Sequence, residues 1–324
     1  MTNKSEHRHT RQTAATAAAL VLGLLTLALP AAALSASPPA VATDAAHSVS
    51  YGSATLTGKI DPRGSNTSYY FQYGATTAYG AQTALADAGA GTTATAVSVP
   101  VSGLLPLTVY HYRLIAVNAA GAATGADRAF KTAKVPLSLA ILVAPNPTVY
   151  GSTATVQGTL SGTGNAGRAV VLQQNPFPYT AGFSDVGNAE LTNTTGGFSF
   201  PVAGLTQATQ YRVVTTTNPP VVSPIAIEGV AVQVSAHVGR AHRRHYARIY
   251  GTVTPAVEGM QVGIMRVIGG RNVLVSGTIL RHKNASSSSF SRTIRVKQHA
   301  LYRIFVKVTN GAQVSNYSSP LFIR

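Results

Sequence analysis

The chain has 324 residues, of which 45% are hydrophobic and 10% charged; it contains no cysteine and carries a formal net charge of +16 at pH 7. The apolar fraction is enough for packed cores and excludes wholesale disorder. The absence of cysteine excludes disulfides and thiolate metal sites. Long helices at a protein surface need many charged residues, so this composition favours short strands joined by tight turns.

The N-terminus has the layout of a secretory signal peptide. Lys4, Arg8 and Arg11 precede an uncharged apolar run over residues 14–29, which ends at Pro30. Small residues follow, so cleavage is predicted after Ala33. We expect a signal peptide at residues 1–33, a linker at 34–41 and a final location outside the cell or at its surface. The alternative is an uncleaved N-terminal membrane anchor.

A weak internal repeat follows, with a period near one hundred residues. Residues 51–58 (YGSATLTG) recur at 150–158 (YGSTATVQG), and a looser copy lies at 246–251 (YARIYG). Each copy alternates apolar and polar residues before a turn, as a half-buried strand requires. The repeat predicts three domains built on one plan.

A tyrosine about sixty residues after the start of each copy marks a second landmark. Tyr110, Tyr211 and Tyr302 each precede an apolar alternating run. In a sandwich of about seven strands, a tyrosine at this corner buries its ring and turns its hydroxyl back to the backbone. All three are therefore interpreted as structural. The predicted fold is all-β, with consecutive immunoglobulin- or fibronectin-III-like sandwiches at residues 42–133, 134–227 and 228–324.

The first domain also resembles a known family. Residues 69–74 (YYFQYG), Tyr79-Gly80, the segment from Leu104 to Tyr110, and Arg113, Asn118, Gly121 and Thr132 are similar to the fibronectin type III-like modules of bacterial surface proteins. The second and third domains resemble bacterial immunoglobulin-like modules in spacing alone. The resemblance implies a bacterial source and a role as spacer, adhesive unit or appendage to a carbohydrate-active enzyme. Such a resemblance implies the fold more strongly than the function.

Signatures of catalysis are not found in the sequence. The carboxylates after the signal segment are scattered over three domains, and Asp185 and Glu190 form the closest pair. Solvated loop acids explain this pair better than general acid and base catalysis. His242 and His245 flank two arginines that would repel a cation, so no metal site is expected. We predict no enzyme, no cofactor and no catalytic or metal-binding residue.

The charge is concentrated in the last domain. Residues 42–134 carry six basic and four acidic side chains, residues 135–227 two of each, and residues 228–324 fourteen basic and two acidic, so the net charges are +2, 0 and +12. A surplus of this kind attracts polyanions. The alternative is a solubilising charge coat with no dedicated partner. Four further cations, Arg266, Arg271, Arg281 and Lys283, are expected on loops, and the predicted polyanion-binding residues are Arg240, Arg243, Arg244, Arg248, Arg295, Lys297, Arg303 and Lys307.

These observations predict a non-enzymatic, exported modular protein that serves as an adhesive or spacer element at a cell surface. Its partner would be a polyanion of the cell wall or the extracellular space, or a polysaccharide. Sequence-specific nucleic-acid recognition is not expected, because no recognition helix or base-stacking motif accompanies the arginines. We expect a monomer. Two alternatives stay open: a carbohydrate-binding accessory protein, and a secreted hydrolase with an unrecognised site that uses Asp185 or Glu190.

Overall fold

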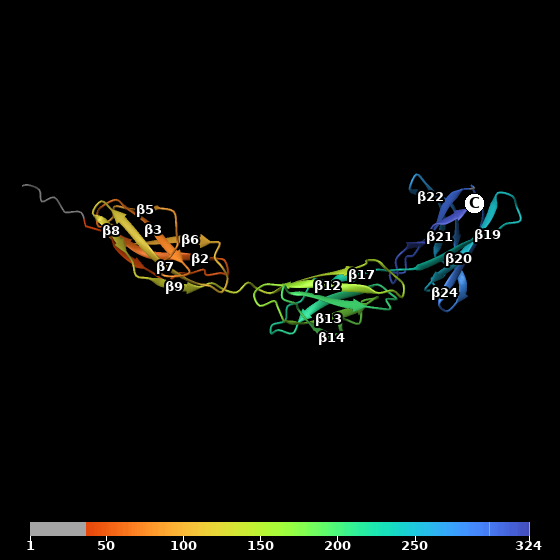
Figure 1. Cartoon of the computed structure of the whole chain (residues 1–324), viewed down its shortest axis with the longest axis horizontal. Coiled ribbons are helices and arrows are strands. Elements are labelled where there is room, and N and C mark those ends of the chain that lie inside the picture. Colours follow the sequence, from red (N-terminus) through yellow and green to blue (C-terminus); the bar gives the residue numbers. More distant parts are fainter. Residues whose placement is uncertain (1–36, 298, 324) are drawn as a thin grey trace, which may run out of the picture.

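The computed structural model of this chain describes residues 37–297 and 299–323. The predicted signal peptide therefore lies outside the described residues. Every regular element in the described part is a β-strand, and these strands form three units that follow one another along the chain (Figure 1). The predicted all-β fold class is confirmed. The described residues contain no helix with the length and apolarity needed to span a membrane.

The first unit packs a sheet ordered β1-β2-β6 against a sheet ordered β4-β3-β7-β8, with β5 and β9 added at its two sides. Two facing antiparallel sheets with this strand order are typical of fibronectin-III-like sandwiches. Strand β1 begins two residues before the domain start expected at residue 42. The strands are β1 (Ala40–Thr43), β2 (Ser53–Asp61), β3 (Thr67–Gly74), β4 (Ala81–Gln82), β5 (Ala86–Gly89), β6 (Thr95–Ser102), β7 (Val109–Asn118), β8 (Gly121–Thr124) and β9 (Arg128–Lys131).

The second unit repeats this plan with sheets ordered β10-β12-β15 and β14-β13-β16-β17, and it adds a short parallel pair, β11 with β18. The strands are β10 (Ser138–Ala144), β11 (Thr148–Val149), β12 (Ala154–Ser161), β13 (Ala169–Pro176), β14 (Ser184–Leu191), β15 (Gly197–Val202), β16 (Thr209–Thr215), β17 (Ala226–Glu228) and β18 (Val230–Ala231).

The third unit has one extra strand on its first sheet, which is ordered β19-β20-β24-β23, whereas the second sheet is ordered β22-β21-β25-β26 with β27 also paired to β25. We call these the β20 sheet and the β21 sheet. The strands are β19 (Gln233–Arg240), β20 (Tyr246–Thr254), β21 (Gln261–Ile268), β22 (Arg271–Ile279), β23 (Arg281–Asn284), β24 (Ser287–Arg295), β25 (Ala300–Lys307), β26 (Asn316–Tyr317) and β27 (Leu321–Ile323).

The repeat seen in the sequence corresponds to equivalent strands of the three sandwiches, β2, β12 and β20, each of which lies next to the first strand of its sheet. Alternate residues of β2, β12 and β20 face the core, since successive side chains of a strand point to opposite faces. The inward residues read alanine, aliphatic, glycine, aliphatic in all three strands, and nearly all of them are buried. They are Ala54, Leu56, Gly58 and Ile60; Ala154, Val156, Gly158 and Leu160; and Ala247, Ile249, Gly251 and Val253.

The three corner tyrosines are buried in their respective cores, with Tyr211 and Tyr302 only 1% exposed. The hydroxyl of Tyr110 accepts a hydrogen bond from the backbone N–H of Leu105, and that of Tyr302 accepts one from the N–H of Lys297, both at 3.0 Å. Tyr211 differs, because its hydroxyl lies beside the side chain of Thr209. The structural role predicted for the rings agrees with this packing, but the backbone bond is made at two of the three corners among the described residues.

The chain passes from the second core to the third at Ala231. Val230 packs in the second hydrophobic cluster and Val232 in the third. The boundary expected from the sequence, between residues 227 and 228, lies before this point. The loop before β26 closes over the junction, where Val314 N–H donates to the carbonyl of Val230 at 2.8 Å and Ala208 N–H donates to that of Ala312 at 2.6 Å.

Candidate functional site

The cations predicted to bind a polyanion lie on two different sheets of the third sandwich. Arg248 and Arg295 are exposed on β20 and β24, and Arg240 ends the neighbouring strand β19. Arg303 and Lys307 instead lie on β25, in the β21 sheet. The remaining three are exposed close to one end of the β20 sheet: Arg243 and Arg244 between β19 and β20, and Lys297 just after β24.

A groove of about 650 Å³ lies on the outer face of the β20 sheet. We call it the cationic groove. It runs between strand β23 on one side and strands β19 and β20 on the other, with β24 between them. Neighbouring strands are about 4.8 Å apart, so the two sides are about 10 Å from each other. The lining residues are His237, Arg248, Tyr250, Gly251, Thr252, Arg281, Lys283, Ser289, Phe290 and Ser291.

The side chains of the groove are held by short polar and aromatic contacts. Arg248 donates from Nε to Ser291 Oγ at 2.8 Å, which positions the guanidinium over the groove. The same guanidinium lies over the ring of Tyr250, 5.3 Å from its centre, and the ring of His237 packs against that tyrosine at 5.7 Å. A cation fixed in this way loses less conformational entropy when it binds an anion.

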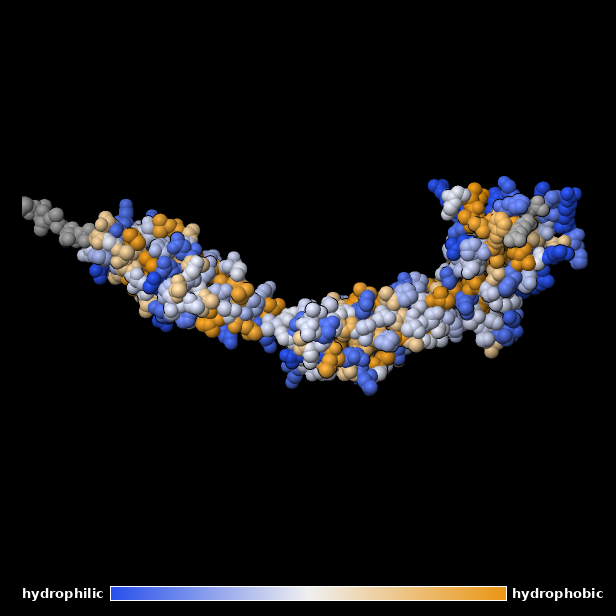
Figure 2. Space-filling view, viewed as in Figure 1, coloured by the Kyte–Doolittle hydropathy of each residue, from blue (hydrophilic) through white to orange (hydrophobic). Residues whose placement is uncertain are grey.

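The groove combines two arginines and a lysine with hydroxyl groups, and no carboxylate lines it. Glu258 is bonded to His282, with 2.6 Å between Oε1 and Nδ1. His282 stands between Arg281 and Lys283 in the strand and therefore points to the other face. The groove thus offers uncompensated positive charge and hydrogen-bond donors to a ligand. Figure 2 shows strongly hydrophilic residues, in deep blue, along the edges of the C-terminal unit.

Of the residues that line the cationic groove, the sequence predicted only Arg248 as polyanion-binding. The expectation that Arg266, Arg271, Arg281 and Lys283 lie on loops is wrong, because all four lie on strands β21, β22 and β23. Strand β23 has four exposed residues, RHKN, with no apolar alternation, since it is an edge strand that lies over no core. Such a segment carries no strand signal in the sequence.

A second polar cluster, also missed by the sequence, lies on the first sandwich. Asp127 accepts hydrogen bonds from Tyr79 Oη and from His111 Nδ1, each at 2.9 Å, and Arg113 lies over the Tyr79 ring at 4.5 Å. The bond from His111, followed by that from Tyr79, lowers the pKa of Asp127. Because Tyr79 and His111 both donate to Asp127, the cluster links the loops before β4 and β9 to strand β7. In the sequence, Tyr79-Gly80 and Arg113 were noted as part of the family resemblance, and nothing indicated that they lie together.

The carboxylates considered for catalysis do not converge. The interpretation of Asp185 and Glu190 as loop acids is wrong, because both lie on strand β14. Strand β14 bulges between them, so they oppose Gln173 and Val170 of β13, which are three residues, or about 10 Å, apart along the strand. Asp185 accepts a hydrogen bond from Gln173 Nε2 at 2.8 Å. Within residues 37–297 and 299–323, no three histidine, aspartate or glutamate side chains are grouped so that they could hold a metal ion.

Comparisons with known proteins add similarity of fold at low identity. No protein-family model and no curated protein matches the chain. Among solved structures, the FN1-FN3 domains of chicken CNTN1 are 15% identical, with 87% of this chain and 95% of that chain covered and a TM-score of 0.30. A structure of titin domains is 14% identical, covers 88% and 98% and has a TM-score of 0.37. Both scores are low, so the fold assignment rests on the strand order described above.

Proposed function

We propose that this chain is a non-enzymatic surface protein whose third sandwich binds a polyanion in the cationic groove. The first two sandwiches then act as spacers between the N-terminal part of the chain and the groove. The observation that carries the proposal is a groove lined by Arg248, Arg281 and Lys283 with hydroxyl groups between them and no carboxylate among its lining residues. A phosphate- or sulfate-bearing polymer has the complementary charge.

We propose a location outside the cell or at its surface, and the N-terminal sequence supports it. A basic N-terminal segment followed by an apolar run and small residues supports export, and an exported protein meets wall polymers and acidic polysaccharides outside the cell. About 1 kcal/mol for each engaged cation gives, for the three groove cations, an affinity weaker than millimolar for one site. Many copies held on one surface would compensate by avidity.

Two double variants with the same change in charge test the proposal. Arg281→Gln/Lys283→Gln removes two cations of the cationic groove. The matched control, Arg271→Gln/Lys307→Gln, removes one arginine and one lysine from the β21 sheet, on the other side of the sandwich. All four side chains are exposed, so folding should be preserved.

The probe is a soluble polyphosphate, with binding to the full chain measured by titration at low salt. We expect the groove variant to lose affinity by about thirtyfold, because two lost contacts of about 1 kcal/mol each correspond to this factor. The control should lose less than about threefold, through the weaker long-range field. Equal losses in the two variants would show that net charge alone attracts the polymer, and the groove would have no special role.

A further inference from the structure

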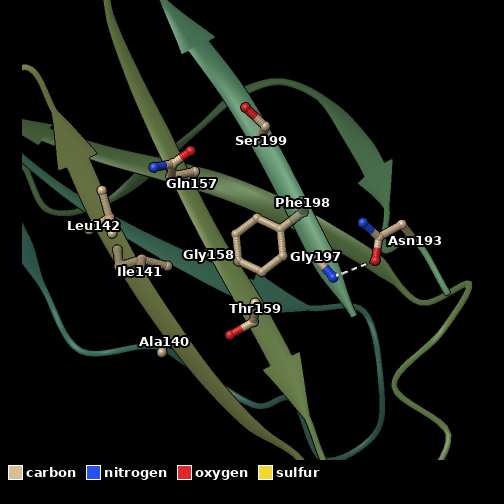
Figure 3. Close-up of a pocket in the computed structure, with 10 residues that line it drawn as sticks. All are labelled: Ala140, Ile141, Leu142, Gln157, Gly158, Thr159, Asn193, Gly197, Phe198 and Ser199. Carbon is tan, nitrogen blue, oxygen red and sulfur yellow. Dashed lines mark hydrogen bonds between the residues drawn. The ribbon is translucent and has the colours of Figure 1, made fainter. Parts of the chain in front are cut away.

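The second sandwich has a hollow of about 570 Å³ on the outer face of the sheet formed by β10, β12 and β15. We call it the neutral hollow. Figure 3 shows Gln157 and Thr159 on the central strand, with Leu142 on one neighbouring strand and Ser199 on the other. The volume lies within the range of roughly 300–1,000 Å³ that small-molecule sites occupy. The lining residues are Ala140, Ile141, Leu142, Gln157, Gly158, Thr159, Asn193, Gly197, Phe198 and Ser199.

Beneath the hollow, on the core side of the sheet, a glycine lets two strands approach closely. A Cβ atom on Gly158 would lie 2.1 Å from the carbonyl oxygen of Ala140 and 2.7 Å from the Phe198 ring. Gly158 pairs with Phe198 across strands β12 and β15. The same arrangement underlies the cationic groove, where Gly251 pairs with Phe290 and its Cβ would lie 2.0 Å from the carbonyl oxygen of Ser235. The two sandwiches therefore share one concave position with different linings.

The lining of the neutral hollow contains no ionisable side chain. Among the described residues, the side chains of Gln157, Thr159 and Ser199 make no hydrogen bond within the protein, so an amide and two hydroxyls face solvent with free donors and acceptors. Asn193 is different, because its Oδ1 accepts from the backbone N–H of Gly197 at 2.8 Å and holds the turn. Its Nδ2 group is left to donate.

These groups surround an apolar floor. Leu142 is 51% exposed, and the exposed side chain of Ala140 lies on the same face of β10. The Phe198 ring points to the opposite face of the sheet, into the core. A sugar ring has an apolar face of C–H groups and an edge of hydroxyls, so it needs an apolar surface flanked by neutral donors and acceptors. A charged polymer would lose hydration here without a counter-charge in return.

We propose that the neutral hollow of the second sandwich binds an uncharged glycan chain. Gln157, Thr159 and Ser199 hydrogen-bond its hydroxyls, and Leu142 packs against the C–H face of a sugar ring. A second copy of this chain is a poorer fit, because Leu142 is the only strongly exposed large apolar side chain among the lining residues. The site is distinct from the cationic groove in residues, sheet and ligand charge.

The test uses the full chain and an array of immobilised neutral oligosaccharides, in about 0.5 M salt so that the cationic groove is screened. The double variant Gln157→Ala/Thr159→Ala removes two of the proposed hydrogen-bonding groups. The matched control is Thr155→Ala, since Thr155 lies on the same outer face of β12 as Thr159 but does not line the hollow. Melting curves verify that all variants are folded.

We expect the wild-type chain to bind at least one neutral oligosaccharide, the double variant to bind it about tenfold more weakly, and the control to stay within about twofold. Wild-type chain that binds no neutral glycan, or equal weakening in the double variant and the control, would overturn the inference. So would dimerisation of the wild-type chain that the double variant abolishes, because a second copy would then occupy the hollow. None of these results depends on polyphosphate binding by the third sandwich, so the two proposals can fail separately.

Discussion

The corner tyrosine of the third sandwich offers a sharp test of how this fold is stabilised. Tyr302 is 1% exposed, and its hydroxyl accepts the N–H of Lys297 at 3.0 Å. Tyr302→Phe keeps the ring but leaves that N–H without a partner, which should cost about 1–2 kcal/mol. Tyr302→Ala also empties the ring's place in the core and should cost about 3–5 kcal/mol.

Tyr211 provides the internal comparison. It is equally buried, but no backbone N–H in the described chain donates to its hydroxyl. Burial, with the nearby charge of Glu228 as a smaller contribution, raises the pKa of Tyr211 to about 12. Tyr211→Phe leaves no backbone donor unpaired, so it should cost less than half as much as Tyr302→Phe.

Hydrogen exchange measured by mass spectrometry on the full chain reads each sandwich separately, because peptides report local opening. A loss of 1–2 kcal/mol speeds exchange about fivefold to thirtyfold, at 1.4 kcal/mol per factor of ten. We expect this increase in peptides of β24 and β25 for Tyr302→Phe, and a smaller change in peptides of β13 and β16 for Tyr211→Phe. Equal effects of the two phenylalanine variants would refute the role assigned to the backbone bond.

Two further predictions concern buried positions. Gly251→Ala places a Cβ 2.0 Å from the carbonyl oxygen of Ser235, so it should destabilise the third sandwich by about 3 kcal/mol in urea unfolding. The control Gly277→Ala, whose Cβ would have its nearest atom at 3.7 Å, should leave stability unchanged. Equal effects of the two variants would contradict the close approach of β19 and β20. Glu228 is fully buried, its Oε2 has no hydrogen-bond partner, and burial raises its pKa. The native state therefore binds this proton more tightly than the unfolded chain does, so stability is highest below the unfolded pKa of about 4.3 and falls as the pH rises. Glu228→Gln should match wild type near pH 4 and melt at a higher temperature at pH 8; an advantage that is the same at both pH values would contradict a buried titrating carboxyl.

The sequence predicted the parts of the fold that depend on local patterns. The inward series of alanine, aliphatic residue, glycine and aliphatic residue in β2, β12 and β20 is visible as a repeat, because residues two apart share one face of a strand. The buried tyrosine rings could be placed for the same reason. The hydroxyl of Tyr211 could not, since its partner depends on the conformation of the preceding turn.

The cationic groove depends on strand order, which the sequence does not display. Arg248 and Arg281 are 33 residues apart and meet only because β24 lies between β20 and β23. Arg295 and Arg303 are close in sequence but lie on different sheets, because the chain crosses the sandwich between β24 and β25. A charge count along the chain therefore located the basic domain but could not separate Arg303 and Lys307, on the β21 sheet, from Arg248, on the β20 sheet.

The salt dependence of polyphosphate binding tests the proposed function most directly. Each phosphate contact contributes a slope of about −0.7 to −0.9 to the logarithm of affinity against the logarithm of salt concentration. With Arg248, Arg281 and Lys283 engaged, the full chain should show a slope of about −2 to −3. Arg281→Gln/Lys283→Gln should bring it close to −1, and Arg271→Gln/Lys307→Gln should leave it unchanged. A slope near zero for the wild-type chain, or the same slope for both double variants, would contradict a polyanion site in the groove.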